Sequence, residues 1–148
     1  MIDLDNFDLH LLSIIRSDWF KLFDLLPEIE AAESFGTLKS GQVQQDDTIS
    51  FPYWEASDLV DKALQQIFDL KLMPVFDWAA WDEGKSLLKN PTFDCTSLNT
   101  RTLCKLLTVI IRADRYNEGF LVTNFENGVM LKIIRALKNN EIDEKNCY

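Results

Sequence analysis

The chain has 148 residues, of which 47% are hydrophobic and 26% charged, a balance that is ordinary for one globular domain and excludes extensive disorder. Fifteen basic against 24 acidic residues give a formal net charge of −9, which disfavours direct binding to nucleic acid or to an anionic membrane. One histidine and three scattered cysteines form neither a zinc-binding spacing nor a disulfide framework, so we expect no metal and no cofactor.

The compartment follows from the same composition. The N-terminus is acidic where a secretory signal is basic, and no apolar run approaches the ~18 residues of a membrane span. Together with an odd number of cysteines, this predicts a cytoplasmic protein with reduced thiols. The acidic charge favours protein partners with basic surfaces, or it serves solubility alone.

The first third of the chain has two parts, a strongly apolar one and a weakly alternating one. Residues 7–33 are dense in Leu, Ile and Phe at helical spacing, and they fit either one long helix or two or three short ones. Residues 34–53 alternate weakly and are punctuated by Gly36 and Gly41. They fit either a small two-stranded hairpin between residues 35 and 51 or a structured loop.

The middle of the chain predicts one clear amphipathic helix and an aromatic cluster. The helix is expected over residues 56–72, and Pro74 ends it. Asp77 is a natural N-cap for a short helix that would place Trp78 and Trp81 on one face. Aromatic pairs at this spacing are more often core contacts than ligand platforms, and the flanking residues here are acidic.

A helix expected over residues 100–117 begins apolar and ends in charged side chains. At ~100° per residue its apolar stripe comprises Leu103, Leu106, Leu107 and Ile110. Asp114 falls near the centre of this stripe, so its carboxylate needs a partner, and Arg112 and Arg115 are the nearest. Glu118 and Asn127 extend the predicted polar network.

This charged cluster has two interpretations. It is either a buried network that locks the last three helices together, or the floor of a polar pocket. In such a pocket an arginine would bind an anion and a carboxylate would act as general base. The candidate catalytic residues are then Arg112, Asp114, Arg115 and Glu118.

The C-terminal part predicts a short segment after Gly119 and a last helix over residues 129–138. The fold class is therefore all-α, a compact bundle of about six helices, with either the small two-stranded hairpin or a structured loop between residues 35 and 51. We expect a single domain over residues 1–138 and a polar, frayed tail over residues 139–148.

Several short motifs are shared with a known family. The C-terminal ones are Leu106-Leu107-Thr108, Ile111-Arg112-Ala113-Asp114-Arg115-Tyr116, Glu118-Gly119 and Ile133-Ile134-Arg135-Ala136-Leu137, and the upstream ones are Phe51-Pro52-Tyr53, Ser57, Phe76-Asp77-Trp78 and Trp81. They resemble a family of uncharacterised bacterial domains whose C-terminal signature reads L-L-T-x-I-I-R-x-D-R-[FY]-x-E-G. The resemblance covers residues 34–138, with Tyr116 where Phe is usual and Asn117 where a small residue is typical. It implies fold and boundaries but no activity.

Two functions fit these features. The first is a non-catalytic protein-interaction module of the immunity, antitoxin or anti-defence type. Its partner would be a protein with a basic surface, and self-association into a homo-oligomer is compatible with this function. Its support is the acidic charge, the small size and the lack of a catalytic motif around the sole histidine, His10. The second is a small enzyme or anion-binding protein built on the charged cluster, which predicts a concave pocket that exposes at least two of its side chains.

Overall fold

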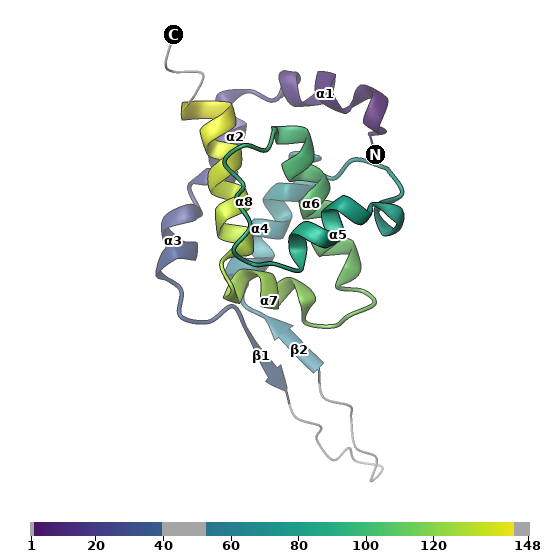
Figure 1. Ribbon diagram of the computed structural model, residues 1–148. Coiled ribbons are helices and arrows are strands. Elements are labelled where there is room, and N and C mark those ends of the chain that lie inside the picture. The colour runs from purple at the N-terminus through teal and green to yellow at the C-terminus, as the bar shows by residue number, and fades with distance from the viewer. Residues whose placement is uncertain (1, 40–52, 144–148) are drawn as a thin grey trace, which may run out of the picture.

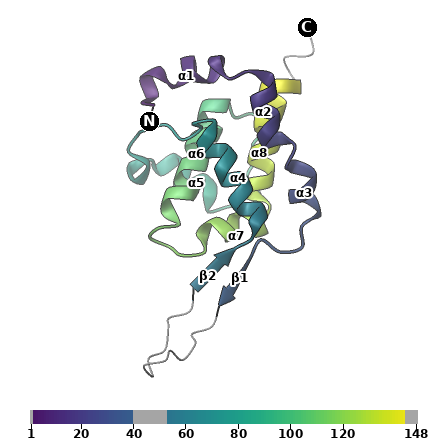
Figure 2. The ribbon, with the colours of Figure 1, turned by 180° about the vertical axis from the view of Figure 1, so that it is seen from behind.

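The computed structural model describes residues 2–39 and 53–143, which form a body of packed helices with one antiparallel hairpin projecting from it (Figure 1). The hairpin stands at one end of the body, and α1 (Leu4–Ser13) lies across the other end in both views (Figures 1 and 2). The predicted fold class, a compact mostly helical bundle with a two-stranded hairpin, is confirmed.

The N-terminal region contains three short helices, which settles the alternative between one long helix and several. After α1 come α2 (Arg16–Phe23) and α3 (Leu26–Ala31). The break between α1 and α2 is made by two β-branched residues, Ile14 and Ile15, whose backbones are extended. Each helix buries some of its large apolar residues, among them Phe7 in α1 and Trp19 in α2.

The hairpin pairs β1 (Gly36–Lys39) with β2 (Tyr53–Ala56), so that Gly36 lies opposite Ala56. The second strand therefore follows the predicted interval of 35–51 instead of lying within it, and residues 40–52 lie outside the described residues. A Cβ on Gly36 would come within 2.9 Å of the Glu55 carbonyl oxygen, so the close packing at this strand end requires glycine.

The central amphipathic helix, α4 (Asp58–Asp69), is shorter at both ends than predicted. Ser57 caps its N-terminus by accepting a hydrogen bond from the Val60 N–H. At its C-terminus Lys71 adopts a left-handed conformation with φ 54°, and its N–H donates to the Phe68 carbonyl. The Leu72 N–H donates to the Ile67 carbonyl, which completes a Schellman motif.

The body is built around α6 (Thr100–Ala113) and α8 (Val129–Lys138), which pack on each other and on α7 (Phe120–Glu126). The helix α4 covers the side seen in Figure 2, while α5 (Asp82–Leu88) crosses α6 on the side seen in Figure 1. Both α7 and α8 begin at a glycine with positive φ, Gly119 at 89° and Gly128 at 84°, which explains why glycines divide this region.

Two boundaries in this part differ from the sequence-based expectation. The helix α6 ends at Ala113 and not near residue 117. The predicted frayed tail begins too early, because residues 139–143 form a π-helical turn, η2 (Asn139–Asp143), that packs on α8. Ile142 is buried there, and the Asn140 side chain donates to the Leu98 carbonyl at 3.0 Å. One buried isoleucine thus holds a segment whose composition is polar.

The helices of the described ranges are too short or too polar for a bilayer. None of them combines the length and the apolar character that crossing a membrane requires.

Candidate functional site

Asp114 is a helix cap and not the partner of an arginine. Because α6 ends at Ala113, Asp114 is the C-cap residue, and it is half-buried. Its Oδ1 accepts a hydrogen bond of 3.0 Å from the Leu121 N–H, in the first turn of α7. The N-cap of α7 is Gly119, which has no side chain to do this, so Asp114 supplies the missing acceptor.

Asn127 has a similar role at the next helix. Its Oδ1 accepts a hydrogen bond of 3.0 Å from the Val129 N–H at the start of α8. Glu118 is exposed in the connection between α6 and α7. The residues predicted to form one network are therefore divided, since the two acceptors cap successive helices and the arginines lie elsewhere.

Arg112 and Arg115 line one cavity of about 480 Å³, together with Phe68, Trp78, Ile111 and Tyr116. We call it the arginine pocket. Arg112 comes from the last turn of α6, and Arg115 follows the helix end. Within the described ranges neither guanidinium forms an ion pair with a carboxylate. The two arginines are thus available to an anion, in a molecule whose net charge is strongly negative.

The aromatic cluster predicted around Trp78 and Trp81 separates in the structure. Trp78 lies in a 3₁₀ turn, η1 (Trp78–Ala80), and α5 begins only after Trp81. Asp77 is the N-cap residue of η1 but forms no side-chain capping bond. The Trp78 ring faces Tyr116 in the arginine pocket, with centroids 6.2 Å apart, whereas Trp81 packs edge-on against Phe76.

Lys105 explains why Trp81 turns away from the pocket. Its ammonium nitrogen lies 4.2 Å from the Trp81 ring centroid and 5.0 Å from that of Phe76, a cation–π arrangement. Partial burial there, with repulsion from Arg101, lowers the pKa of Lys105. This contact joins the start of α5 to α6. Trp78, and not Trp81, therefore lines the arginine pocket.

A smaller hollow of about 180 Å³ adjoins the arginine pocket. The two share Phe68 and Arg112, and the smaller one also contains Lys71 and the apolar side chain of Met73. Three cationic side chains thus line one continuous stretch of surface between the end of α4 and the end of α6.

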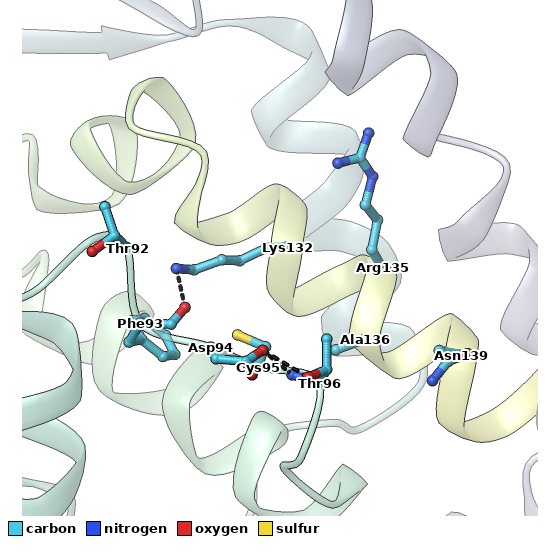
Figure 3. A pocket seen from close by; sticks show the side chains of 9 residues that line it. All are labelled: Thr92, Phe93, Asp94, Cys95, Thr96, Lys132, Arg135, Ala136 and Asn139. Atoms are coloured by element: carbon cyan, nitrogen blue, oxygen red, sulfur yellow. Dashed lines mark hydrogen bonds between the residues drawn. The ribbon is translucent and has the colours of Figure 1, made fainter.

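A second cavity of about 480 Å³ lies between the 92–96 segment and α8 (Figure 3). Its polar groups already have partners in the protein. The Lys132 ammonium donates to the carbonyls of Pro91 and Phe93 and lies 4.0 Å from the Phe93 ring centroid. The Arg135 side chain points away from the cavity, as Figure 3 shows, and pairs with Glu30 of α3.

Two further titratable side chains of this second cavity, Asp94 and Cys95, are also held by the protein. Burial raises the pKa of the Cys95 thiol to about 11, so the thiolate that nucleophilic chemistry needs is scarce at neutral pH. Hydrogen bonds from the Thr96 N–H and hydroxyl lower the pKa of Asp94. The polar groups around this cavity hold the loop against α8. The arginine pocket is therefore the better candidate for a ligand site.

The outer face of α1 is a third feature, which sequence reasoning missed. We use this name for Leu9 and Leu12 of α1 together with Ile15, which lies just beyond the end of the helix; they are 69%, 75% and 60% exposed, whereas Phe7 and Leu11 of α1 are buried. Because this part of the sequence is rich in apolar residues throughout, its composition does not show which of them are buried and which are exposed. The available signal was that Leu9 and Leu12 lie three residues apart and off the stripe of Phe7 and Leu11.

Comparisons with known proteins add a family but no activity. Neither the curated proteins nor the solved structures include a match to this chain. A family model matches residues 14–143, a span that contains all of the 34–138 over which a family resemblance was expected. The match begins after α1 and includes every residue that lines the arginine pocket. Of the residues that line the smaller hollow, it leaves out Ile2. The chain belongs to this family, a family of unknown function designated DUF6508.

Proposed function

We propose that this protein is a non-catalytic interaction module that binds a protein partner through the outer face of α1. The observation that carries the proposal is the exposure of Leu9, Leu12 and Ile15, each more than half accessible. Large apolar side chains gathered on one surface mark protein interfaces, because their burial against a partner is favourable. Their exposure does nothing for this fold, since α1 is anchored by other residues.

The apolar side chains of that face do not anchor α1, although Asp8 at its border pairs with Arg101 of α6 at 3.4 Å. Phe7 is fully buried and Leu11 nearly so. The His10 Nε2 lies 2.8 Å from the Leu70 carbonyl, to which it donates a hydrogen bond because the carbonyl oxygen can only accept. Arg101 of α6 donates to the Leu4 carbonyl. The outer face of α1 is thus presented on a fixed support.

The charge around this face indicates the chemistry of the partner. Asp5 and Asp8 lie one turn before Leu9 and Leu12 on the helix surface, so carboxylates border the apolar side chains. With the net charge of −9, this favours a partner that presents basic groups around an apolar centre. Immunity, antitoxin and anti-defence proteins are the kinds of module that would use such a face.

The test starts with capture on the immobilised full chain from a lysate of the source cells at low salt. The captured protein is then purified and its direct binding measured. We expect a basic partner whose affinity falls at least about tenfold for the double variant Leu9→Ser, Leu12→Ser. Asp5→Asn should slow association and reduce its salt dependence, and Asp8 is left unchanged because it pairs with Arg101 of α6.

The matched control is Val75→Ser, which changes another half-exposed apolar residue outside α1 and should leave binding unchanged. Circular dichroism verifies the fold of every variant. A partner that binds the leucine variants as tightly as the parent chain, or whose binding is insensitive to salt, would refute the proposal, and so would the absence of any direct binder.

A further inference from the structure

We propose that the arginine pocket binds a small aromatic oxyanion, that is, a carboxylate or a phosphate carried on a planar ring. The cavity of about 480 Å³ falls in the range of roughly 300–1,000 Å³ typical of small-molecule sites. It combines two chemistries in one place, because two guanidinium groups and three aromatic rings are among the side chains that line it.

The arginines select for an oxyanion. A guanidinium is planar and presents its N–H groups as a fork that matches carboxylate or phosphate oxygens. Arg112 and Arg115 come from the last turn of α6 and the residues after it, so both can approach one group in the cavity. None of the residues that line the cavity is acidic.

A purely structural role accounts for only part of this arrangement. A cation in the last turn of a helix is favourable because it compensates the helix dipole, and this explains Arg112 on α6. It does not explain why Arg115, beyond the helix end, lines the same cavity as three aromatic side chains. A ligand that uses both groups accounts for the whole set.

The aromatic residues select for a planar ring. The Trp78 and Tyr116 rings are 6.2 Å apart at centroid and inclined by 33°, and they line the cavity with Phe68. Tyr116 is 78% exposed and Phe68 50%, so a ring stacked on them would bury apolar surface that the fold leaves in water.

Lys71 brings a further positive charge to the adjoining hollow. Its left-handed conformation, φ 54°, is one that glycine adopts without strain and that lysine adopts at a cost. The Schellman motif that ends α4 accounts for this backbone conformation, but it does not require a lysine side chain at the position. Here the lysine adds a third cation beside Arg112, the residue common to both hollows.

The experiment measures binding to the full chain by titration calorimetry with four probes. These are phenyl phosphate and benzoate, which have both chemistries, inorganic phosphate, which lacks the ring, and benzyl alcohol, which lacks the charge. We expect phenyl phosphate or benzoate to bind at least about tenfold more tightly than either partial probe. The stronger of the two distinguishes a phosphate from a carboxylate ligand.

Variants then locate the site. Arg115→Gln and Tyr116→Ala change exposed side chains, and each should weaken the binding of the aromatic anions at least about tenfold. Arg135→Gln is the matched control, because it removes an arginine that pairs with Glu30 on the other cavity, and binding should be unchanged. Melting curves show whether each variant is folded.

Three results would overturn the proposal: no aromatic anion binding at millimolar concentration, equal affinity for inorganic phosphate and phenyl phosphate, or binding that Arg115→Gln leaves intact. The inference is separable from the partner proposed for α1. Arg115→Gln should leave partner binding unchanged, and the leucine variants of α1 should leave anion binding unchanged.

Discussion

At the scale of single residues, the block from Arg112 to Glu118 shows how one position can be recognised as special and assigned the wrong partner. The helical count identified Asp114 as a residue that needs a partner. It could not identify the partner, because the count assumes that α6 continues to residue 117 and the helix ends at Ala113. The acceptor then faces a backbone N–H seven residues later, a relation that depends on where the chain turns.

The capping role of Asp114 leads to the first prediction. Asp114→Ala removes the acceptor of the Leu121 N–H and should lower the free energy of unfolding by about 0.5–2 kcal/mol, as the loss of other helix caps does. Asp114→Asn keeps an acceptor oxygen and should lose less than half as much. Urea denaturation followed by circular dichroism measures both. Equal losses in the two variants would show that the charge matters and not the cap.

A second prediction concerns Lys71. Lys71→Gly relieves the left-handed backbone and should raise the free energy of unfolding by about 1 kcal/mol. Lys71→Ala removes the same side chain but keeps the strain, so it should give no gain. Thermal and urea unfolding of the pair separate the two effects. A stabilised alanine variant would mean that the lysine side chain, and not the backbone, carries the cost.

At the scale of elements, segments were predictable where one strong local signal decides them. The last helix was expected over residues 129–138 and α8 occupies that range, because Gly128 marks its start and its apolar stripe is regular. The hairpin was harder, since its second strand pairs through Gly36 and Ala56 and not through any alternation within residues 35–51. The turn η2 was not predictable, because Ile142 is its single apolar anchor.

The helix α1 offers a third prediction, which separates its two faces. Phe7→Ala should lower the free energy of unfolding by about 3–5 kcal/mol, because the ring is fully buried and its removal leaves a cavity. Leu12→Ala should change it by no more than about 0.5 kcal/mol, because that side chain is 75% exposed. Urea denaturation of the two variants measures the contrast. A large loss in Leu12→Ala would mean that the outer face is needed for the fold and would weaken its assignment as an interface.

At the scale of the whole molecule, the candidate sites lie at the surface, outside the buried core. The arginine pocket is formed by the end of α4, by η1 and by the end of α6, and the last of these lies more than 30 residues beyond the other two in the sequence. The sequence could identify Arg112 and Arg115 as conspicuous, but not Phe68 as their neighbour, because that contact exists only after α4 packs near the end of α6. Residue types were therefore predictable, whereas the composition of the pocket was not.

The dependence of stability on pH is a further property of the whole molecule, and it gives the fourth prediction. Burial raises the pKa of Cys95 from 9.0 to about 11 and also raises the pKa of Cys104. Both thiols therefore lose their protons more readily in the unfolded chain. Their contribution to stability is complete below pH 9 and is lost as pH rises toward and beyond 11. Lys105 opposes this, because its lowered pKa makes folding more favourable as pH approaches 10.5.

A variant isolates the thiol contribution from that of Lys105. Cys104→Ala should lower the free energy of unfolding at pH 7.5 by about 1 kcal/mol, through the lost burial of the sulfur atom. Above pH 9 its stability should fall less steeply than that of the parent chain. The difference in slope can reach at most about 1.4 kcal/mol per pH unit for one group. Urea denaturation between pH 7.5 and 10.5 gives both curves. If they stay parallel over that range, the Cys104 thiol titrates alike in the folded and unfolded chains, and its burial does not govern the alkaline limit of this fold.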